Sequence, residues 1–334
     1  MDPISQGVVG AIVTHAAVGH RLPRAAALVG MLAGMAPDLD IFFPTFGDVT
    51  ADWYWHRGPT HAIAYIPLGA LIVWAIMLIF PFARKHKAAT YFAALVGTAT
   101  HGLLDALTSY GTMLLWPFAD TRIAWDIMPI IDPIFTVTLV LVTIVAVIRK
   151  RWTWSVGGSV FMVAYLGFAL GQHTRAIDAA RTLAESRGHD VDRLRVLPAP
   201  TALSLYRAIY EHDGQLHVDA VFTPYFFGES RVLEGTSAAI MRPGDLSLDA
   251  EQQRHFDRFR WFSQDTLVQP SYAEPRRLGD GRYSSEAAGF NPLWGLDFSG
   301  GTTRRFFGRG DIDAGELIDA ILGKDDRFVY NATP

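Results

Sequence analysis

The chain has 334 residues, of which 50% are apolar and 19% charged, and its formal net charge is −4. The weak negative charge and the lack of a basic stripe argue against a nucleic-acid-binding protein, so we expect no nucleic-acid partner. The absence of cysteine excludes disulfides and thiolate metal sites, so any metal ligand here is nitrogen or oxygen. The N-terminus lacks a basic region and a small-residue cleavage site, and we expect no cleaved signal peptide.

Two short apolar segments open the chain. Residues 3–20 are rich in small residues, which favour close helix packing in a membrane. The sequence Arg21-Leu22-Pro23-Arg24 interrupts the pattern, and a second segment, 25–36, ends at Pro37-Asp38-Leu39-Asp40. Both segments are short for full spans, so we expect them to be tilted or partly buried under other helices.

Longer apolar runs follow, and each has the length of about 20 residues that crosses a hydrocarbon core. These candidate spans are residues 62–83, 88–108, 127–148 and 152–171. A large buried helical bundle in a soluble protein is the alternative, but four such runs in close succession favour a membrane. The sequence therefore predicts a mostly α, polytopic transmembrane helical bundle in the inner membrane.

The charges between the runs predict a topology. Basic clusters at 84–87 and 149–151 fall at the same end of the predicted bundle. The positive-inside rule assigns that end to the cytoplasm. The aromatic-rich loops 38–61 and 109–126 then face the other side, together with everything after residue 172. Aromatic residues favour the membrane–water interface, so we expect those of the first loop, Trp53 among them, to lie there.

The last third of the chain has the pattern of a soluble domain. Strand-like segments 204–210 and 215–222 flank His212-Asp213-Gly214, a hairpin turn signal. Residues 248–262 and 313–322 are predicted helices. We therefore expect three parts: a membrane-embedded helical metal-site domain over 1–175, a helical connector over 176–196, and a β-rich α+β domain over 197–334.

The strongest chemical signal is the pair His101 and Asp105 near the end of the run 88–108. A spacing of four residues puts both side chains on one helix face, one turn apart. An imidazole and a carboxylate so placed can hold one metal ion. A hydrogen-bonded pair in a helical core is the alternative reading of these two residues alone.

Other ionisable residues lie in or beside the apolar segments: His15, His20, Asp38, Asp40, His56, His61, Asp126 and Asp132. Such groups are costly at membrane depth and usually pair, line a cavity or bind an ion. Nitrogen and oxygen ligands suit zinc, with manganese or iron as alternatives, in one or two sites. Asp126 and Asp132 also fit a turn and a helix start, whereas His56 and Arg57 also fit hydrogen bonding to an anionic substrate.

These residues stand within a set of motifs that resembles a known family. The motifs are Thr14-His15, Pro37-Asp38-Leu39-Asp40, His56-Arg57-Gly58-Pro59-Thr60-His61, His101-Gly102-Leu103-Leu104-Asp105, Thr108-Ser109-Tyr110-Gly111 and Trp116-Pro117-Phe118. Over about residues 5–180 the chain resembles the YdjM-like family of predicted membrane-bound metal-dependent hydrolases. That family is distantly similar to zinc-dependent phospholipase C and the P1-type nucleases, which cleave phosphate esters at a zinc cluster.

The resemblance implies a ligand set for this chain. The implied metal ligands are His15, Asp38 or Asp40, His56 or His61, His101 and Asp105, with Asp105 as a bridge between ions. The soluble enzymes carry a further His, a downstream His-x-x-x-Asp/Glu pair and an N-terminal Trp ligand, which have no match here. The resemblance therefore implies one or two metal ions and not three.

Three functions are consistent with this sequence. The first is a metal-dependent hydrolase for a phosphoester, possibly lipid-linked, in which His56 or Arg57 stabilises negative charge on the substrate. The second is a transporter in which His101, Asp105 and Asp132 relay protons or ions. The third is a non-enzymatic membrane protein whose metal fixes the helices.

Overall fold

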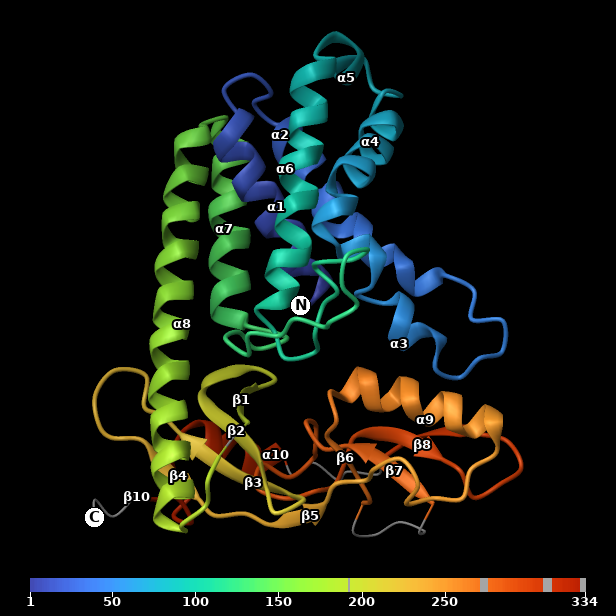
Figure 1. Ribbon diagram of the computed structural model, residues 1–334. Helices are drawn as coiled ribbons and strands as arrows, with labels where there is room; N and C mark the ends of the chain where they lie inside the picture. The colour runs from blue at the N-terminus through green and yellow to red at the C-terminus, as the bar shows by residue number, and fades with distance from the viewer. Residues whose placement is uncertain (192, 271–275, 309–313, 331–334) are drawn as a thin grey trace. The chain divides into compact units, whose positions relative to one another are not determined.

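The computed structural model describes residues 1–191, 193–270, 276–308 and 314–330, and the chain forms two compact units (Figure 1). The first unit comprises Met1–Pro44 and Trp55–Ala169, and the second comprises Thr45–Tyr54 and Leu170–Pro334. The first is helical and the second carries the β-sheets. The short segment 45–54 therefore belongs with the C-terminal part of the chain, although it lies early in the sequence.

The helical unit is built from α-helices of very different lengths and from 3₁₀ turns. The helices are α1 (Pro3–Val18), α2 (Ala25–Met35), α4 (Ile66–Met77), α5 (Pro81–Lys85), α6 (Lys87–Ala106), α7 (Pro133–Arg149) and the first part of α8 (Trp152–Ser186). Three 3₁₀ turns lie among them, namely η1 (Ala36–Phe42), η2 (Pro59–His61) and η3 (Ile63–Tyr65). The five-residue helix α3 (Ala51–Trp55) crosses the division between the units.

Two helical segments of the described residues are long and apolar enough to cross a membrane, Ala25–Phe42 and Trp152–Ser186. A third candidate is the bent pair Ala51–His61 and Ile63–Met77, which turns by 58°. The N-terminal region is thus mostly helical with two candidate spans, which is less than the predicted polytopic bundle. The segment expected to be short, 25–36, continues through a 3₁₀ turn to Phe42 and gains the length of a span.

Two of the predicted spans have different bounds in the structure. The run 62–83 is divided among η3, the twelve-residue helix α4 and the start of α5, because prolines at 67 and 81 start new helices instead of continuing one. The run 127–148 becomes helical only at Pro133, where Asp132 accepts a hydrogen bond from the amide of Phe135 and caps α7. Chain-breaking residues, which hydropathy alone ignores, decide both outcomes.

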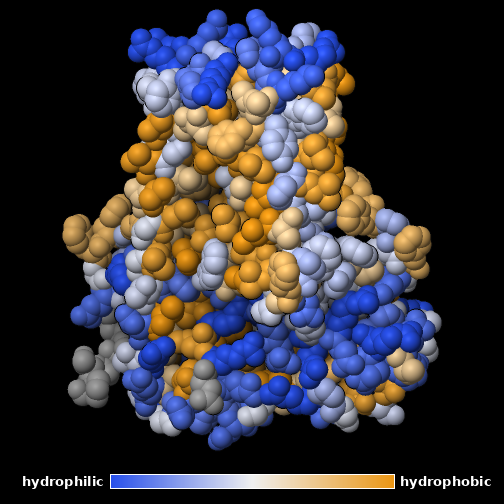
Figure 2. Space-filling view, turned by 45° about the horizontal axis from the view of Figure 1, so that its top comes forward, coloured by the Kyte–Doolittle hydropathy of each residue, from blue (hydrophilic) through white to orange (hydrophobic). Residues whose placement is uncertain are grey.

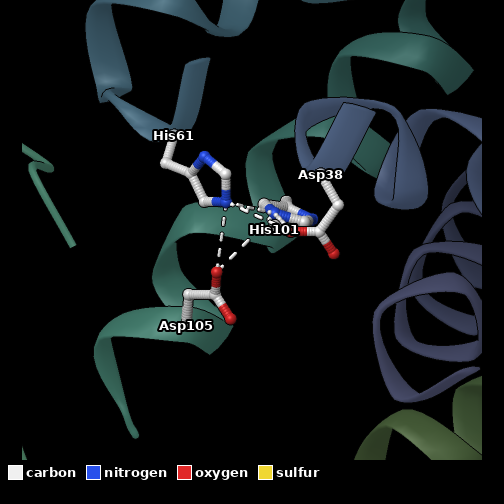
Figure 3. Close-up of side chains that lie close together, drawn as sticks. All are labelled: Asp38, His61, His101 and Asp105. Atoms are coloured by element: carbon white, nitrogen blue, oxygen red, sulfur yellow. Dashed lines mark hydrogen bonds and ion pairs between the residues drawn. The ribbon is translucent and has the colours of Figure 1, made fainter. Parts of the chain in front are cut away.

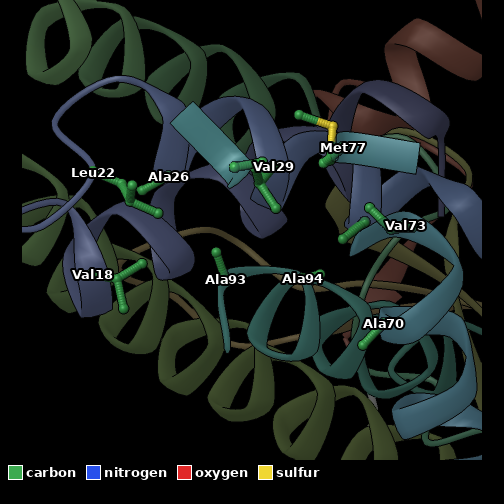
Figure 4. Close-up of a cluster of buried hydrophobic side chains, with 11 residues drawn as sticks. Val18, Leu22, Ala26, Val29, Ala70, Val73, Met77, Ala93 and Ala94 are labelled. Carbon is green, nitrogen blue, oxygen red and sulfur yellow. The ribbon is translucent and has the colours of Figure 1, made fainter. Parts of the chain in front are cut away.

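Small residues bring α1, α2 and α6 into backbone contact. A Cβ on Gly10 would lie 2.3 Å from the carbonyl oxygen of Gly30, and a Cβ on Gly30 would lie 2.3 Å from that of Gly10. On α6, a Cβ on Gly97 would lie 2.7 Å from the same Gly30 oxygen. This close packing, beside the buried apolar cluster shown in Figure 4, draws α2 and α6 together near their polar residues.

The outer surface of the helical unit is apolar. Val137, Leu141 and Val163, on α7 and α8, are each more than half exposed. Figure 2 shows hydrophobic residues spread over this unit and hydrophilic residues at one end of it. In Figure 1, α5 and the turn between α7 and α8 lie at the same end, as expected for the two basic clusters. An apolar belt with a charged end is typical of membrane helices.

The C-terminal unit contains two antiparallel sheets. The larger has the order β1-β2-β3-β4-β10 with β5 also paired to β3, and the smaller has the order β6-β7-β8-β9. The strands of the larger sheet are β1 (Leu194–Ala199), β2 (Ala202–His212), β3 (Gln215–Phe222), β4 (Arg231–Leu233), β5 (Ser237–Ala239) and β10 (Val329–Tyr330). Those of the smaller are β6 (Leu267–Val268), β7 (Arg277–Asp280), β8 (Trp294–Asp297) and β9 (Arg304–Phe307).

The predicted hairpin is confirmed. Asp213 and Gly214 have φ of 49° and 72°, so both central residues adopt the left-handed conformation that joins β2 to β3 in a two-residue turn. The predicted helices appear as α9 (Ala250–Ser263) and α10 (Ala314–Ile321), and position 313 lies outside the described residues. A β-sheet-rich C-terminal domain is therefore shown.

One expectation for the aromatic loop is wrong. Trp53 was expected at the membrane–water interface, but its side chain is buried in the C-terminal unit, 4% exposed. Its ring stacks on Phe259 and Phe262 of α9, with centroids 4.5 and 5.2 Å apart, and Arg305 lies over it at 4.3 Å. An aromatic-rich segment can pack in a protein core as well as lie at a membrane–water interface, and composition does not distinguish the two.

Candidate metal centre

Four side chains converge inside the helical unit: Asp38, His61, His101 and Asp105. His101 and Asp105 come from the C-terminal turns of α6, Asp38 from η1 after α2, and His61 from η2. Figure 3 shows these side chains pointing toward one another from three separate chain segments. The i, i+4 pair that the sequence singled out is therefore half of a larger group.

The donor atoms are spaced as metal ligands are. The Nε2 of His61 lies 2.8 Å from Nε2 of His101, 3.4 Å from Oδ1 of Asp38 and 3.2 Å from Oδ2 of Asp105. The Nε2 of His101 lies 3.4 Å from Oδ1 of Asp38 and 3.7 Å from Oδ2 of Asp105. With bonds of about 2.0–2.2 Å, the donors of a tetrahedral zinc site lie about 3.3–3.6 Å apart. The spacing of the donor atoms is thus close to that around one bound divalent ion.

Oxygen atoms outside the group orient both imidazoles. The Nδ1 of His101 donates to the carbonyl oxygen of Gly34 at 2.5 Å. The Nδ1 of His61 faces Oδ2 of Asp40 at 3.3 Å and Oγ1 of Thr60 at 3.0 Å. Because each Nδ1 has an oxygen partner, each Nε2 can present its lone pair to the centre, as in protein metal sites whose ligating histidines are held by an outer shell.

Asp105 brings a buried negative charge to the centre. Its Oδ2 accepts no hydrogen bond among the described residues, although Nε of Arg57 lies 3.2 Å away. Its Oδ1 accepts a hydrogen bond from the side chain of Gln6 at 2.9 Å and contacts the amino group of Met1. A buried carboxylate oxygen without a hydrogen bond is costly, and a cation bound between the four donors would satisfy it.

The group opens on one side. The side chain of Asp38 is 19% exposed, whereas those of the other three donors are between 0% and 1% exposed. His56 is 26% exposed, its Nδ1 is 2.8 Å from Oδ1 of Asp40, and its ring centroid is 6.0 Å from that of His61. Of the four donors, Asp38 is therefore the one that solvent reaches.

Asp40 contacts several of the residues that surround the donor group. Its carboxylate contacts His56 and His61 and accepts hydrogen bonds from the amide of Arg57 at 3.2 Å and the hydroxyl of Thr60 at 2.8 Å. The structure thus separates the alternatives left by the sequence. It places Asp38 and His61 in the donor group and Asp40 and His56 one contact outside it.

Three of the candidate residues are engaged elsewhere. His15 hydrogen-bonds Ser155 Oγ at 2.7 Å and the carbonyl oxygen of Pro23 at 2.9 Å, so neither ring nitrogen reaches the donor group. Asp132 caps α7 and accepts a hydrogen bond from Tyr165 at 2.8 Å. Asp126 adopts a positive φ of 57°, as expected of a turn residue.

Sequence reasoning missed Gln6, and it gave Thr108 and Tyr110 no role beyond their place in a motif. Gln6 is fully buried on α1, and Thr108 accepts a hydrogen bond from Nη1 of Arg57 at 2.7 Å. The Arg57 guanidinium also lies 4.9 Å from the ring centre of Tyr110. A glutamine in a mostly apolar helix was the available signal for Gln6, because a buried amide needs a partner.

Comparisons with known proteins give the family context. Residues 1–176, which include all the donors, match the family model described as "YdjM inner membrane protein". A curated relative, the inner membrane protein YbcI of Escherichia coli (strain K12), is 27% identical over 135 residues, which cover 36% of this chain and 75% of the relative. No solved structure matches.

Proposed function

Since the chain belongs to the YdjM inner membrane protein family, we propose that it is a polytopic, membrane-bound, metal-dependent hydrolase acting on phosphoesters. The observation that carries the proposal is the convergence of two imidazole nitrogens and two carboxylates around one point, among them Oδ2 of Asp105, which accepts no hydrogen bond from the described residues. Soluble regions rarely bury such a group without a partner ion, and a membrane makes it costlier.

The residues fit a divalent ion. His61, His101, Asp38 and Asp105 would hold it, and zinc suits this set best, with manganese or iron as alternatives. When bound, such an ion supplies Lewis acidity and lowers the pKa of water, so that a hydroxide nucleophile becomes available near neutral pH. The sequence allowed one or two ions, and the described residues form one four-donor group.

The neighbouring side chains suit an anionic substrate. Arg57 is 5% exposed and its guanidinium lies between Asp105 and the ring of Tyr110. Its positive charge would stabilise a phosphate oxygen that enters from the open side. His56 stands at that opening, oriented by Asp40, where it can donate a hydrogen bond to the substrate. We assign catalytic roles to Arg57 and His56.

Placement in the membrane makes a lipid substrate the first to test. The donors of α6 lie at the end opposite to the basic segment 84–87 that precedes this helix. By the positive-inside rule we place the metal centre and the C-terminal domain on the non-cytoplasmic side. A centre near that interface would meet lipid headgroups, so membrane lipids are the proposed partners and a lipid-linked phosphoester the proposed substrate.

A structural metal is the second candidate, and the number of donors favours it. Four protein ligands complete a tetrahedral shell, whereas catalytic zinc keeps one position open. The transporter alternative has less support, because four ionisable residues gather at one point and Asp132 is occupied by capping α7 and by Tyr165.

The test combines metal content with hydrolysis by the full chain purified in detergent and returned to lipid. Wild type is compared with His101→Asn and Asp105→Asn, and with His20→Ala as a control for loss of an exposed histidine. Substrates are bis-(p-nitrophenyl) phosphate and vesicles that contain phosphatidate. Circular dichroism establishes that each variant is folded.

Each outcome assigns the function. Stoichiometric metal with hydrolysis, both lost in the two donor variants and kept in His20→Ala, supports the hydrolase. Stoichiometric metal without hydrolysis of either substrate supports the structural role. A folded wild type that binds no zinc, manganese or iron after reconstitution overturns both.

A further inference from the structure

The loop between β3 and β4 carries a pair of exposed aromatic residues. Phe226 is 82% exposed and Phe227 is 94% exposed. The loop lies within the C-terminal unit, whose buried apolar side chains form cores around the larger sheet. Two adjacent phenylalanines at a loop tip are unfavourable in water, and such exposure marks a contact surface.

The base of this loop is attached to α8. The side chain of Gln172 donates to the carbonyl oxygens of Leu203, Thr223 and Pro224 at 3.2–3.3 Å. Arg175 donates to the carbonyl oxygens of Pro224 at 2.8 Å and Gly228 at 2.7 Å. Figure 1 shows the loop beside the lower part of α8.

The loop itself is closed. A hydrogen bond of 3.1 Å joins the hydroxyls of Thr223 and Ser230 across its base. Gly228 has φ of 108°, a conformation that side-chain-bearing residues rarely adopt, and so turns the chain back after the two phenylalanines. The pair is therefore presented by a loop that is tied at both ends.

The attachment point sets the depth of the loop along α8. The apolar part of this candidate span ends at residue 171, and Gln172 and Arg175 are in the next turn of the same helix. A run of 20 helical residues is about 30 Å long, the thickness of a hydrocarbon core. Gln172 and Arg175 thus fall where α8 enters the headgroup region.

We propose that Phe226 and Phe227 form a membrane anchor that inserts into the lipid interface beside α8. The occupant of this surface is the bilayer that α8 spans, because the loop is tied within one turn of the end of the apolar run. Aromatic side chains prefer the interface, where the ring leaves water without full burial in hydrocarbon. The anchor would hold the ends of β3 and β4 that this loop joins against the membrane.

The absence of cysteine makes the test direct, since single cysteines can be spin-labelled in an otherwise unreactive chain. The full chain is reconstituted into vesicles of equal parts phosphatidylethanolamine and phosphatidylglycerol. The label is placed by Glu229→Cys, next to the intact phenylalanine pair. Its accessibility to oxygen, relative to a water-soluble nickel chelate, reports depth.

Positions on α8 provide the scale. Labels at Val163→Cys and Leu170→Cys define the hydrocarbon and its edge, and Glu185→Cys, ten residues beyond Arg175 and about 15 Å further along the helix, defines water. If the anchor inserts, the ratio of oxygen to nickel-chelate accessibility for the label at 229 should be close to the ratio measured at Leu170. The double substitution Phe226→Ser and Phe227→Ser should change the ratio at 229 to the value measured at Glu185. A ratio at 229 equal to that at Glu185 with both phenylalanines present overturns the proposal.

A second variant separates lipid contact from folding. The double serine variant changes only exposed side chains, so its circular dichroism and thermal unfolding should match wild type. The same label is also read in detergent-free nanodiscs at dilution, where a second copy of the chain is absent. Burial of the label in crowded vesicles only, and not in single-copy nanodiscs, would assign the pair to a protein contact and overturn the lipid anchor.

Discussion

The Nε2 atoms of His61 and His101 face each other at 2.8 Å, although the residues are forty positions apart in the sequence. The Nδ1 of His101 donates to Gly34, and that of His61 faces Asp40 and Thr60. A neutral imidazole has one N–H, so hydrogen on both Nδ1 atoms leaves two lone pairs pointing at each other. Such an arrangement is repulsive unless a proton or a metal ion lies between the two nitrogen atoms, so the pair is compatible with a metal centre.

Replacing Asp40 should weaken metal binding without abolishing it. Asp40→Asn keeps the shape of the side chain but removes the charge that faces Nδ1 of His61. Loss of such an outer partner typically costs about 10–100-fold in metal affinity. Competition with a chelator measures this, with the exposed Asp120→Asn as the matched control. An affinity for Asp40→Asn equal to that of wild type would contradict the assigned role.

A methyl group at Gly102 should disturb the centre by displacing the backbone of His61. A Cβ there would lie 2.2 Å from the carbonyl oxygen of His61, so η2 must move. Overpacking of this kind costs about 1–3 kcal/mol, and we expect Gly102→Ala to lower both the thermal midpoint and the metal content. Gly157→Ala on α8 is the control, because nothing lies within 4 Å of its Cβ. Equal thermal midpoints and metal contents of the two variants would show that η2 moves without loss of stability or metal binding, contrary to the prediction.

Trp53 should be a major contributor to the stability of the C-terminal unit. Removing a large buried aromatic side chain costs about 3–5 kcal/mol, and Trp53 is stacked on Phe259 and Phe262. Trp53→Ala should therefore unfold at a clearly lower temperature than wild type. Trp55→Ala, in the same short helix but 38% exposed, is the control and should lose much less. A larger fall in the unfolding temperature for Trp55→Ala than for Trp53→Ala would refute the packing of segment 45–54.

The C-terminal unit should lose stability in mild acid. Burial, followed by the nearby charges of His189 and Arg187, holds the pKa of His217 below its ordinary value of 6.5. The unfolded chain then binds more protons, so stability is present above about pH 6.5 and falls as the pH drops below it. His217→Gln should reduce the drop in thermal midpoint between about pH 7.5 and 5.5. If the thermal midpoint of this variant depends on pH as that of wild type does, His217 is excluded as a cause of the loss of stability in acid.

That histidine belongs to a cluster which only the fold reveals. The rings of His189 and His212 stack with centroids 4.2 Å apart, and His189 lies 4.7 Å from His217. In the sequence the three have no ligand spacing and read as separate surface residues. The β2–β3 hairpin and the chain that follows α8 bring them together.

The sequence by itself determined the elements whose signals are local. Helical apolar runs, the Asp213-Gly214 turn and the His101–Asp105 spacing each depend on a few neighbouring residues, and the structure contains all three. The length of the apolar runs also predicted membrane helices, because hydropathy is a property of composition. It could not give their bounds, since prolines at 59, 67 and 133 decide where helices begin.

Only the tertiary structure decided which polar residues meet. Asp38 and Asp40 are two positions apart and chemically identical, yet the 3₁₀ turn η1 sends one to the donor group and the other to His56. His15 fitted the implied ligand set but is held by Ser155 of α8. These outcomes depend on how close the helices approach, which glycine contacts such as Gly10 with Gly30 set over long sequence separations. Local patterns carry no information about such distances, and the centre is therefore a product of packing.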